Sequence, residues 1–296
     1  MGAPTTTDVS GLMLVDKPAG VTSHDVVALV RRVAGGARAG HAGTLDPFAT
    51  GLLVLLLGRA TRLVSYLNGE PKVYEATIRF GAETDTDDAT GNVTREAPLP
   101  DRDAVDAAIV QLTGTFDQQP PAYSAKKVAG VRAYAAARRG DALDLAPAPV
   151  VVHDWTVLAR QGSDLTARIS CSGGTYIRAL GRDLGRRAGS AAHLVELRRI
   201  ASGPYAVGDA VSLDRLRAGE LPIRPMREIV ADLPAVSVGV EARASVARGR
   251  AVAADAPGRP GERVALLDDE QTLIAVAERV GDRGDSLQPR VVLADA

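Results

Sequence analysis

The stretch GHAGTLDPFATG, residues 40–51, places one histidine and one aspartate among small and hydroxyl-bearing residues. Asp46 precedes a proline, which moves it out of helical backbone angles and favours a turn. A glycosidase would need a paired acid and base, but this stretch carries a single carboxylate. A lone carboxylate suits a covalent nucleophile, and Gly40, Gly43 and Gly51 would leave room for a ligand. The alternative is an Asx turn that leads into the next apolar segment.

Two other stretches lack the residues that their patterns require. Residues 35–40 have the glycine spacing that opens a phosphate-binding loop, but His and Ala follow where Lys and Ser or Thr are needed. Residues 85–88 are as acidic as the start of a calcium loop, but Ala and Thr follow at ligand and glycine positions. The single cysteine, Cys171, excludes a multi-thiolate metal site and an internal disulfide. We therefore expect no metal and no cofactor.

Composition narrows the class of protein further. With 296 residues and 46% hydrophobic content, the chain has enough apolar material for a main domain and a smaller one. The longest apolar run, residues 52–57, is far shorter than the roughly 18 residues of a membrane span. The first residues lack the basic and apolar segments of a secretory signal. We therefore expect a cytoplasmic protein that makes no membrane contact.

Charge distribution is more informative than the formal net charge of -1. Residues 118–140 contain no Asp or Glu but five basic residues, and residues 178–199 hold a second, arginine-rich cluster. Arginine suits bidentate contacts with phosphate, although a solvated helix face would carry the same charges. The clusters therefore allow a nucleic-acid partner without requiring one.

Several elements must position residues 40–51. Residues 12–15 predict a strand, and Thr22 or Ser23 should cap a helix that stops at Gly35 and Gly36. The apolar run 52–57 fits either a buried strand or a core helix segment, because its length does not separate the two. Residues 73–80 alternate between apolar and polar, which predicts a half-buried strand.

The second half of the chain mixes strands and helices without a regular repeat. Residues 104–112 predict a helix, and a strand at 165–171 leads through two glycines into another helix at about 176–187. After a boundary near Pro234, short strands at 263–267 and 272–277 flank an acidic turn. This order predicts an α+β fold with a small β-rich tail.

The loop and five further motifs resemble the TruB-type pseudouridine synthases, which isomerise the T-loop uridine at standard position 55 of tRNA. The motifs occur in the same order and span residues 16–199. They are residues 16–23 (DKPAGVTS), 72–76 (KVYEA), 119–127 (QPPAYSAKK), 173–178 (GGTYIR) and 192–199 (AHLVELRR).

The resemblance assigns three catalytic residues. It implies that Asp46 attacks either the uracil ring or the ribose anomeric carbon, after which the detached base rotates and rejoins through carbon. Arg178 would pair with Asp46 and keep it ionised and oriented. Tyr74 would stack on the target base and help to move a proton.

The resemblance also implies residues that bind the substrate. A uridine in a folded loop must be extruded before it can react, and His41 would support that flipped-out arrangement. Tyr176 and Leu197 would line the base pocket. Lys17, beside Pro18, would support the active-site loops. Phosphates would be gripped by the basic insertion, with Lys126, Lys127 and Arg132 as its candidate contacts.

The family further implies the domain order and the partners. We expect a mixed, largely antiparallel sheet flanked by helices in a catalytic domain at 1–234, with the insertion at about 117–150, and a PUA-like accessory RNA-binding domain at 235–296. That tail has eight Arg, no Lys and ten Asp and Glu, so strong phosphate binding by it is not expected. We expect a monomer that acts on the tRNA T stem-loop without an obligate protein partner.

Two rival functions remain open. One is a catalytically silent RNA-binding or RNA-folding protein that uses the same surface, against which the presence of all three catalytic residues weighs. The other is the same chemistry on ribosomal RNA within guide-RNA particles. Assembly of that kind favours long basic extensions, which this sequence lacks.

Overall fold

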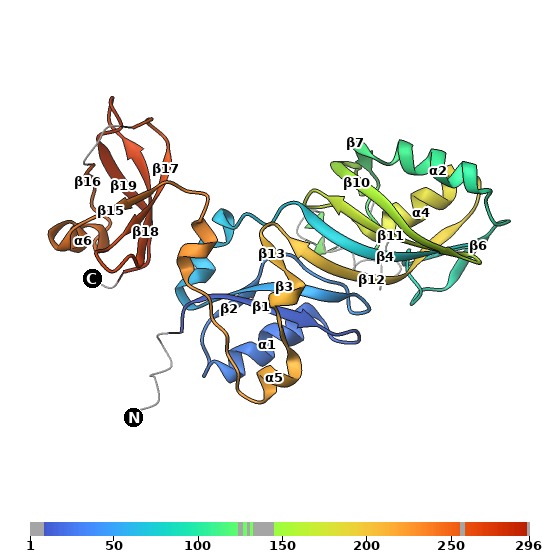
Figure 1. Ribbon diagram of the computed structural model, residues 1–296, viewed down its shortest axis with the longest axis horizontal. Helices are drawn as coiled ribbons and strands as arrows, with labels where there is room; N and C mark the ends of the chain where they lie inside the picture. The colour runs from blue at the N-terminus through green and yellow to red at the C-terminus, as the bar shows by residue number, and fades with distance from the viewer. Residues whose placement is uncertain (1–8, 124–126, 129–130, 133–144, 255–257, 295–296) are drawn as a thin grey trace.

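In a computed structural model, the described residues are 9–123, 127–128, 131–132, 145–254 and 258–294, with only the backbone described at 127–128 and 131–132. Figure 1 shows a central group of blue strands, a second group of strands and helices beside it, and a separate red group at the C-terminal end. Among these described residues, no helix has the length and apolar character needed to cross a membrane.

The described residues form a 10-stranded sheet. In spatial order its main path consists of β14 (Val211–Ser212), β1 (Gly11–Lys17), β3 (Thr50–Leu57), β12 (Ala192–Ser202), β4 (Lys72–Phe80), β11 (Asp164–Cys171), β10 (Ala148–Gln161) and β7 (Gly114–Gln118). Strand β2 (Ala39–His41) pairs with β3, and β13 (Tyr205–Ala206) pairs with β12. Only β1–β14 and β3–β12 are parallel among these pairs. The sheet is therefore mixed and largely antiparallel, which confirms the expected fold class.

The first half of the sheet, β14, β1, β2 and β3, is covered on one face by α1 (Ser23–Val33) and α5 (Leu213–Arg217) (Figure 1). Thr22 caps α1 by accepting a hydrogen bond from the backbone of Asp25. The apolar run 52–57 lies within β3 and is buried on both faces. This double burial explains why the run is continuous instead of alternating.

The second half comprises β12, β4, β11, β10 and β7, with α2 (Arg102–Gln111) and α4 (Ile177–Arg187) packed together beside it. In β4 the side chains of Tyr74, Ala76, Ile78 and Phe80 are buried, and Arg79 is exposed. The half-buried strand expected from alternation is therefore confirmed. The hairpin β5 (Ala82–Thr84) and β6 (Val93–Glu96) follows β4.

The two halves meet at a narrow seam where β3 runs parallel to β12. Only Thr50 and Gly51 of β3 pair with Arg198 and Arg199 of β12. Gly51 has a φ of 98°, and an added Cβ would overlap the backbone of Arg199. The expectation that Gly51 leaves room for a ligand is therefore wrong, because the backbone of β12 occupies that space.

The C-terminal sheet begins at Ala235, directly after Pro234. Its spatial order is β15 (Ala235–Ser237), β17 (Arg263–Leu267), β18 (Leu273–Val280), β19 (Ser286–Val292) and β16 (Val252–Ala253), with α6 (Val240–Ala247) beside it. Ala265 and Val276 of this sheet share an apolar cluster with Val54 of β3. Around that cluster lie the 3₁₀-helices η1 (Gly58–Tyr66), η2 (Val207–Asp209) and η3 (Met226–Val230).

Part of the expected insertion is described. Strands β8 (Lys127–Val128) and β9 (Val131–Arg132) form an antiparallel pair in which the backbone of Lys127 lies opposite that of Arg132. Lys126 lies outside the described residues, and the side chains of Lys127 and Arg132 are not described. The insertion's expected role in gripping phosphate thus stays a prediction.

Candidate active site

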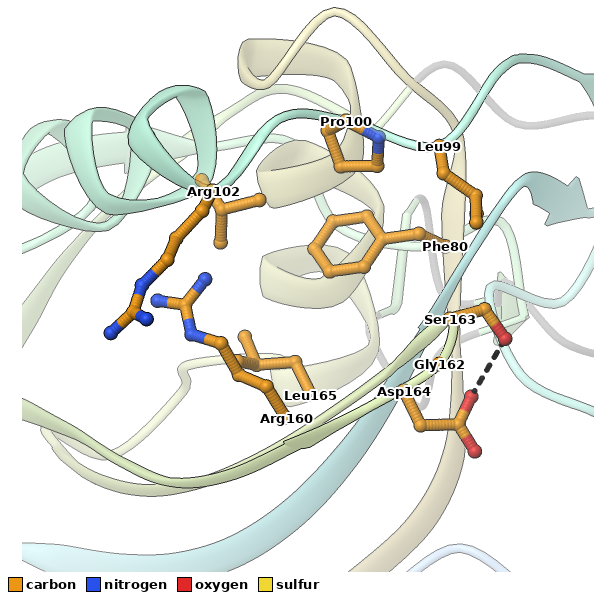
Figure 2. Close-up of a pocket in the computed structure, with 10 residues that line it drawn as sticks. Phe80, Leu99, Pro100, Arg102, Arg160, Gly162, Ser163, Asp164 and Leu165 are labelled. Atoms are coloured by element: carbon orange, nitrogen blue, oxygen red, sulfur yellow. Dashed lines mark hydrogen bonds between the residues drawn. The ribbon is translucent and has the colours of Figure 1, made fainter.

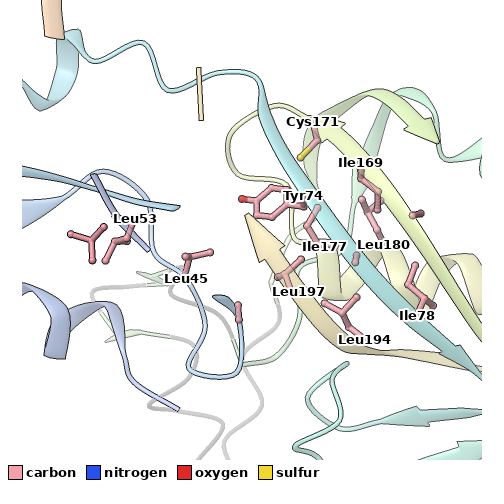
Figure 3. Packing of buried hydrophobic residues seen from close by; sticks show 14 of the residues in the cluster. Leu45, Leu53, Tyr74, Ile78, Ile169, Cys171, Ile177, Leu180, Leu194 and Leu197 are labelled. Carbon is pink, nitrogen blue, oxygen red and sulfur yellow. The ribbon is translucent and has the colours of Figure 1, made fainter. Parts of the chain in front are cut away.

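A pocket of about 260 Å³ lies at the seam between the two halves of the sheet. Figure 3 shows Tyr74, Ile177 and Leu197 on the side of the second half, with Leu45 across from them on the loop before β3. The residues that line it are Gly43, Thr44, Leu45, Asp46, Lys72, Tyr74, residues 174–178, Leu197 and Arg199. Four separate segments of the chain therefore contribute to one cavity.

Asp46 lies in the loop between β2 and β3, and its side chain is 36% exposed. Arg178, in the first turn of α4, approaches it with Nε 2.9 Å from Oδ2 and Nη2 3.3 Å from Oδ1. This paired geometry fixes the orientation of the carboxylate through two hydrogen bonds. The nucleophile candidate and the arginine expected beside it, 132 residues apart, are thus in direct contact.

Arg178 is itself held on several sides. Its side chain is 6% exposed, and it donates to the carbonyl oxygens of Thr86 and Tyr123, each at 2.8 Å. Asp88 Oδ2 lies 3.6 Å from Nη1. A guanidinium with this many acceptors has little freedom to turn away from Asp46.

The acidic turn at 85–88 supplies partners for arginine. Asp87 lies 2.9 Å from Arg182, one turn along α4 from Arg178, and burial raises the pKa of Asp87 to about 6 despite that cation. No cluster of three or more His, Cys, Asp or Glu side chains suited to a metal occurs in the described ranges. Sequence reasoning did not identify this role, because nothing local marks the arginines that lie 90 or more residues away.

Lys17 stabilises the loop that carries Asp46. Its side chain is fully buried, and Nζ donates to the carbonyl oxygens of Pro18, Val21 and Pro47 at 3.0, 2.8 and 3.3 Å. Burial lowers the pKa of Lys17 to about 8, although the negative charge of Asp46 opposes the shift. Lys17 does not line the pocket, so its contacts are those of a loop support, not of a group that touches a ligand.

The start of α1 provides a second anchor for the loop. Ser23 Oγ donates to the carbonyl oxygen of Leu45 at 3.0 Å and accepts from the backbone nitrogen of Leu45 at 2.9 Å. Both backbone groups of the residue before Asp46 are therefore satisfied by one buried hydroxyl. The loop is fixed although it has no regular secondary structure.

Tyr74 forms part of the pocket wall with its side chain 7% exposed. Burial raises the pKa of its hydroxyl, and the nearby guanidinium of Arg199 acts in the opposite direction. Arg199 is 1% exposed and donates to the carbonyl oxygens of Leu52 and Gly43, at 2.7 and 3.1 Å. It therefore ties β12 both to β3 and to the loop before it, a role that its place in a basic cluster did not reveal.

The remaining residues expected to bind substrate divide into two groups. Tyr176 and Leu197 line the pocket, and Tyr176 is fixed by Gln118, which accepts from its backbone nitrogen at 2.8 Å and donates to its carbonyl oxygen at 3.1 Å. His41 lies on β2 outside the lining, and its Nδ1 is buried without a hydrogen-bond partner among the described residues. Burial lowers the pKa of His41, and Arg199 adds to that shift.

Three functional candidates were missed by sequence reasoning: Lys72, Gln118 and Arg199. Lys72 and Arg199 stand inside the quoted motifs, two residues before Tyr74 and two after Leu197. That spacing places each on the same face of its strand as a pocket residue, which was the available signal. Gln118 carried no such signal, because its partner is 58 residues away.

A second, smaller hollow of about 160 Å³ lies near Phe80, at the opposite end of β4 from Lys72 (Figure 2). Its other lining residues include Leu99, Arg102, Arg160 and Asp164. Both arginines already pair with Asp106 beside the hollow. None of the residues expected to act on substrate lines it, so the seam pocket is the candidate active site.

Two solved structures share this architecture over most of their length. One, described as a Cbf5-Nop10-Gar1 complex, aligns with a TM-score of 0.70 at 28% identity and covers 96% of this chain and 85% of that chain. The other, an H/ACA RNP bound to a substrate RNA containing 2′-deoxyuridine, gives a TM-score of 0.69 at 25% identity, with the same coverage.

Sequence comparison identifies the family. The model for the TruB family pseudouridylate synthase N-terminal domain matches residues 31–177, and that for the tRNA pseudouridylate synthase B C-terminal domain matches residues 178–230. tRNA pseudouridine synthase B of Thermobifida fusca (strain YX) is 47% identical over 96% of this chain and 98% of its own. The corresponding Streptomyces coelicolor protein is 42% identical over 95% and 97%. The chain therefore belongs to the TruB family of pseudouridylate synthases and is an enzyme.

Proposed function

We propose that this enzyme converts the T-loop uridine at position 55 of tRNA to pseudouridine, with Asp46 as the covalent nucleophile and a flipped-out nucleotide as substrate. The relatives reported above carry the name tRNA pseudouridine synthase B, which supports tRNA as the substrate. The observation that carries the mechanism is the partly exposed carboxylate of Asp46, held by the buried guanidinium of Arg178 inside a pocket.

The pocket dimensions favour a single nucleoside. About 260 Å³ lies just below the roughly 300–1,000 Å³ of pockets that enclose drug-sized ligands. A base stacked inside an RNA helix has no access to such a recess, so the target must leave its stack. Tyr74, Tyr176 and Leu197 present aromatic and apolar surface to the base, and His41 would support the flipped arrangement behind the loop.

The chemistry balances without an added reagent. Asp46 attacks either the uracil ring or the ribose anomeric carbon, and the C1′–N1 bond breaks with its electron pair passing to the base. After rotation, C5 bonds to C1′, C5 loses its proton, N1 gains one, and the Asp46 carboxylate is released. Tyr74 lines the same pocket as this carboxylate and is proposed to help with the proton transfer.

We also propose a division of labour within the chain. Residues 1–234 form the catalytic domain, with an RNA-gripping insertion at about 117–150, and residues 235–296 form a PUA-like accessory domain. The C-terminal sheet is separate from the first, and residues 235–296 carry a net formal charge of -2. We therefore expect this domain to contribute little to phosphate binding. We further propose that the enzyme works as a monomer on the T stem-loop, without an obligate protein partner.

The decisive experiment incubates the purified full-length protein alone with an unmodified tRNA transcript and maps pseudouridine along the product. We expect modification at position 55 and none in a matched transcript that carries cytidine there. Binding without any pseudouridine would favour the silent RNA-binding alternative and overturn the proposal. Modification at a different position would overturn the substrate assignment alone.

The insertion has its own test. Replacing Lys126, Lys127 and Arg132 with Ala should weaken tRNA binding and reduce the slope of log affinity against log salt by about 2–3. A control variant replaces three exposed arginines of the accessory domain, Arg243, Arg248 and Arg250, and should change the slope less. An unchanged slope in the insertion variant would contradict the proposed phosphate grip.

A further inference from the structure

Lys72 is a cation of the pocket to which neither the sequence motifs nor the family assignment gives a role. It begins β4, two residues before Tyr74, and both side chains face the cavity. Its backbone is fixed on both sides, opposite Cys171 of β11 and Ser202 of β12. The side chain therefore extends from a rigid central strand into the recess that holds Asp46.

The ammonium group of Lys72 is unused. Within the described residues, Nζ makes no hydrogen bond and no ion pair, and Glu70 acts on it only at longer range. The other two cations in the lining are occupied, Arg178 by Asp46 and two carbonyl groups, and Arg199 by two carbonyl groups. Lys72 is thus the cation that remains available to a ligand.

Two glycines keep the ammonium accessible. A Cβ placed on Gly173 would lie 3.5 Å from Lys72 Nζ, and one placed on Gly43 would lie 3.7 Å from it. Nζ therefore lies between Gly173 and the loop that holds Gly43. On the Gly173 side the carboxylate of Glu70 is its neighbour, because Glu70 Oε1 lies even closer than Nζ to the same Cβ position. Only four of the 35 basic residues of this chain are lysines, so a compact point charge at this position contrasts with the arginines used elsewhere.

We propose that Lys72 is a catalytic residue whose ammonium donates a hydrogen bond to a uracil carbonyl oxygen as negative charge develops on the base. The inference rests on the proposed function. When the C1′–N1 bond breaks, the electron pair passes to the uracil, and attack of Asp46 on the ring would likewise place negative charge on it. Lys72 could therefore stabilise the base whether Asp46 attacks the ribose or the uracil ring. It transfers no proton and forms no covalent bond, so the balance of the reaction is unchanged.

The setting of Lys72 suits this role. Burial lowers the pKa of Lys72, Arg199 lowers it further, and Glu70 and Cys171 oppose these shifts. An ammonium that has lost part of its hydration gains more from an anionic oxygen than one in water does. Preorganised donors of this kind contribute about 10²–10³-fold to rate in other enzymes.

The test measures single-turnover pseudouridine formation at saturating tRNA and, separately, equilibrium tRNA affinity. Lys72→Met should lower the saturating rate about 10²–10³-fold and change the affinity little, because the contact strengthens only as charge develops. Lys72→Arg keeps a cation and should retain more activity than Lys72→Met. The matched control is Arg79→Met, which removes an exposed cation from the opposite face of β4 and should leave the saturating rate unchanged.

Chemical rescue distinguishes the loss of the ammonium group from a disturbance of the fold. Lys72→Ala should recover rate when methylammonium is added, with a melting temperature equal to that of the wild type by circular dichroism. A slow variant that neither methylammonium nor the Arg substitution improves would overturn the proposal.

Two other outcomes would also overturn it. A full saturating rate in Lys72→Met would show that the ammonium is not catalytic. An unchanged saturating rate with weaker binding and a salt slope reduced by about one would assign Lys72 to an RNA phosphate. If the wild type itself formed no pseudouridine, the proposed function would be wrong. A normal wild type with an unaffected Lys72→Met variant would contradict only the role of Lys72, so the two outcomes can be told apart.

Discussion

The surroundings of the seam pocket and the C-terminal sheet differ in what they bury. The buried charged residues before residue 235 in the described ranges are Lys17, Glu83, Asp87, Asp88, Arg178, Arg182 and Arg199. From residue 235 onward, Asp268 is the single buried charged residue in the described part, and it accepts hydrogen bonds from two backbone nitrogens of its own turn. The rest of that sheet's interior is apolar.

This difference indicates that the region around the pocket is less stable than an apolar core would be, because it buries charged groups. A buried charge is costly even when it is paired, and an apolar core of the same volume is often more stable. The raised pKa of Asp87 and the lowered pKa of Lys17 both have burial as their largest cause. The region before residue 235 thus holds buried charges in place at a cost in stability, whereas the interior of the C-terminal sheet is almost entirely apolar.

The largest effect should follow from removing the nucleophile. Asp46→Asn keeps the size of the side chain but removes its nucleophilic charge and one of the two oxygens that accept from Arg178. We expect a loss of about 10⁴-fold or more in pseudouridine formation, with tRNA affinity and the free energy of unfolding nearly unchanged. Single-turnover assays and filter binding on a T-stem-loop transcript measure the two quantities. Wild-type turnover in this variant would show that the nucleophile is wrongly assigned.

The next effect should come from the arginine that orients it. Arg178→Lys retains the charge but loses the planar fork, and we expect a rate about 10²–10³-fold lower. Arg178→Met should also destabilise the protein by about 3–5 kcal/mol, because Asp88 stays buried without its cation. Urea unfolding measures this loss. A Met variant as stable as the Lys variant would contradict the view that buried charges here depend on one another.

As pH rises, the titration of Lys17 should lower the reaction rate and raise the free energy of unfolding. As pH rises through about 8, Lys17 loses a proton and one of its three carbonyl contacts, so the saturating rate should fall. Its folded pKa lies below the usual 10.5, so the unfolded chain binds more protons between about 8 and 10.5, and this residue's contribution to stability rises there.

Variants of Lys17 separate this group from others that titrate. Lys17→Arg keeps its charge and should move the decline in rate to higher pH. Lys17→Met should lower the rate about 10²-fold near neutral pH by displacing the loop. A pH profile in Lys17→Arg identical to that of the wild type would assign the decline to another residue.

The smallest effect on chemistry should arise in the C-terminal core. Leu287→Ala removes a fully buried side chain and should destabilise the protein by about 2–5 kcal/mol, with a saturating rate within about twofold of the wild type. Leu180→Ala is the matched change beside the pocket, in the same cluster as Tyr74, and should reduce both stability and rate. Equal losses of rate in Leu287→Ala and Leu180→Ala would contradict the proposed difference between the C-terminal sheet and the surroundings of the pocket.

Local signals in the sequence were sufficient for some of the elements, but they left β3 open between strand and helix and did not indicate β10 or β12. The alternation in residues 73–80 identified β4, and the Thr22 cap identified the start of α1, because both depend on neighbours a few residues away. The glycine pair before Arg178 likewise marked the start of α4 closely. The motifs then indicated which side chains of these elements to examine.

Distant partners could not be read from the sequence. Gly51 was interpreted as space for a ligand, whereas the parallel pairing of β3 with β12 fills that space with the backbone of Arg199. The same pairing places Arg199 against Leu52, 147 residues away. No local pattern encodes a contact of that span, so the arginine network and the free ammonium of Lys72 became visible only in three dimensions.

The narrow seam between β3 and β12 also sets the order in which the enzyme becomes competent during synthesis. Asp46 leaves the ribosome early, but Arg178 and the strand that docks against Gly51 follow more than 130 residues later. Until that segment emerges, Asp46 lacks the guanidinium that orients it, so the proposed catalytic site is incomplete. The candidate site can therefore assemble only after the first two thirds or so of the 296-residue chain, up to Arg199, has been synthesised.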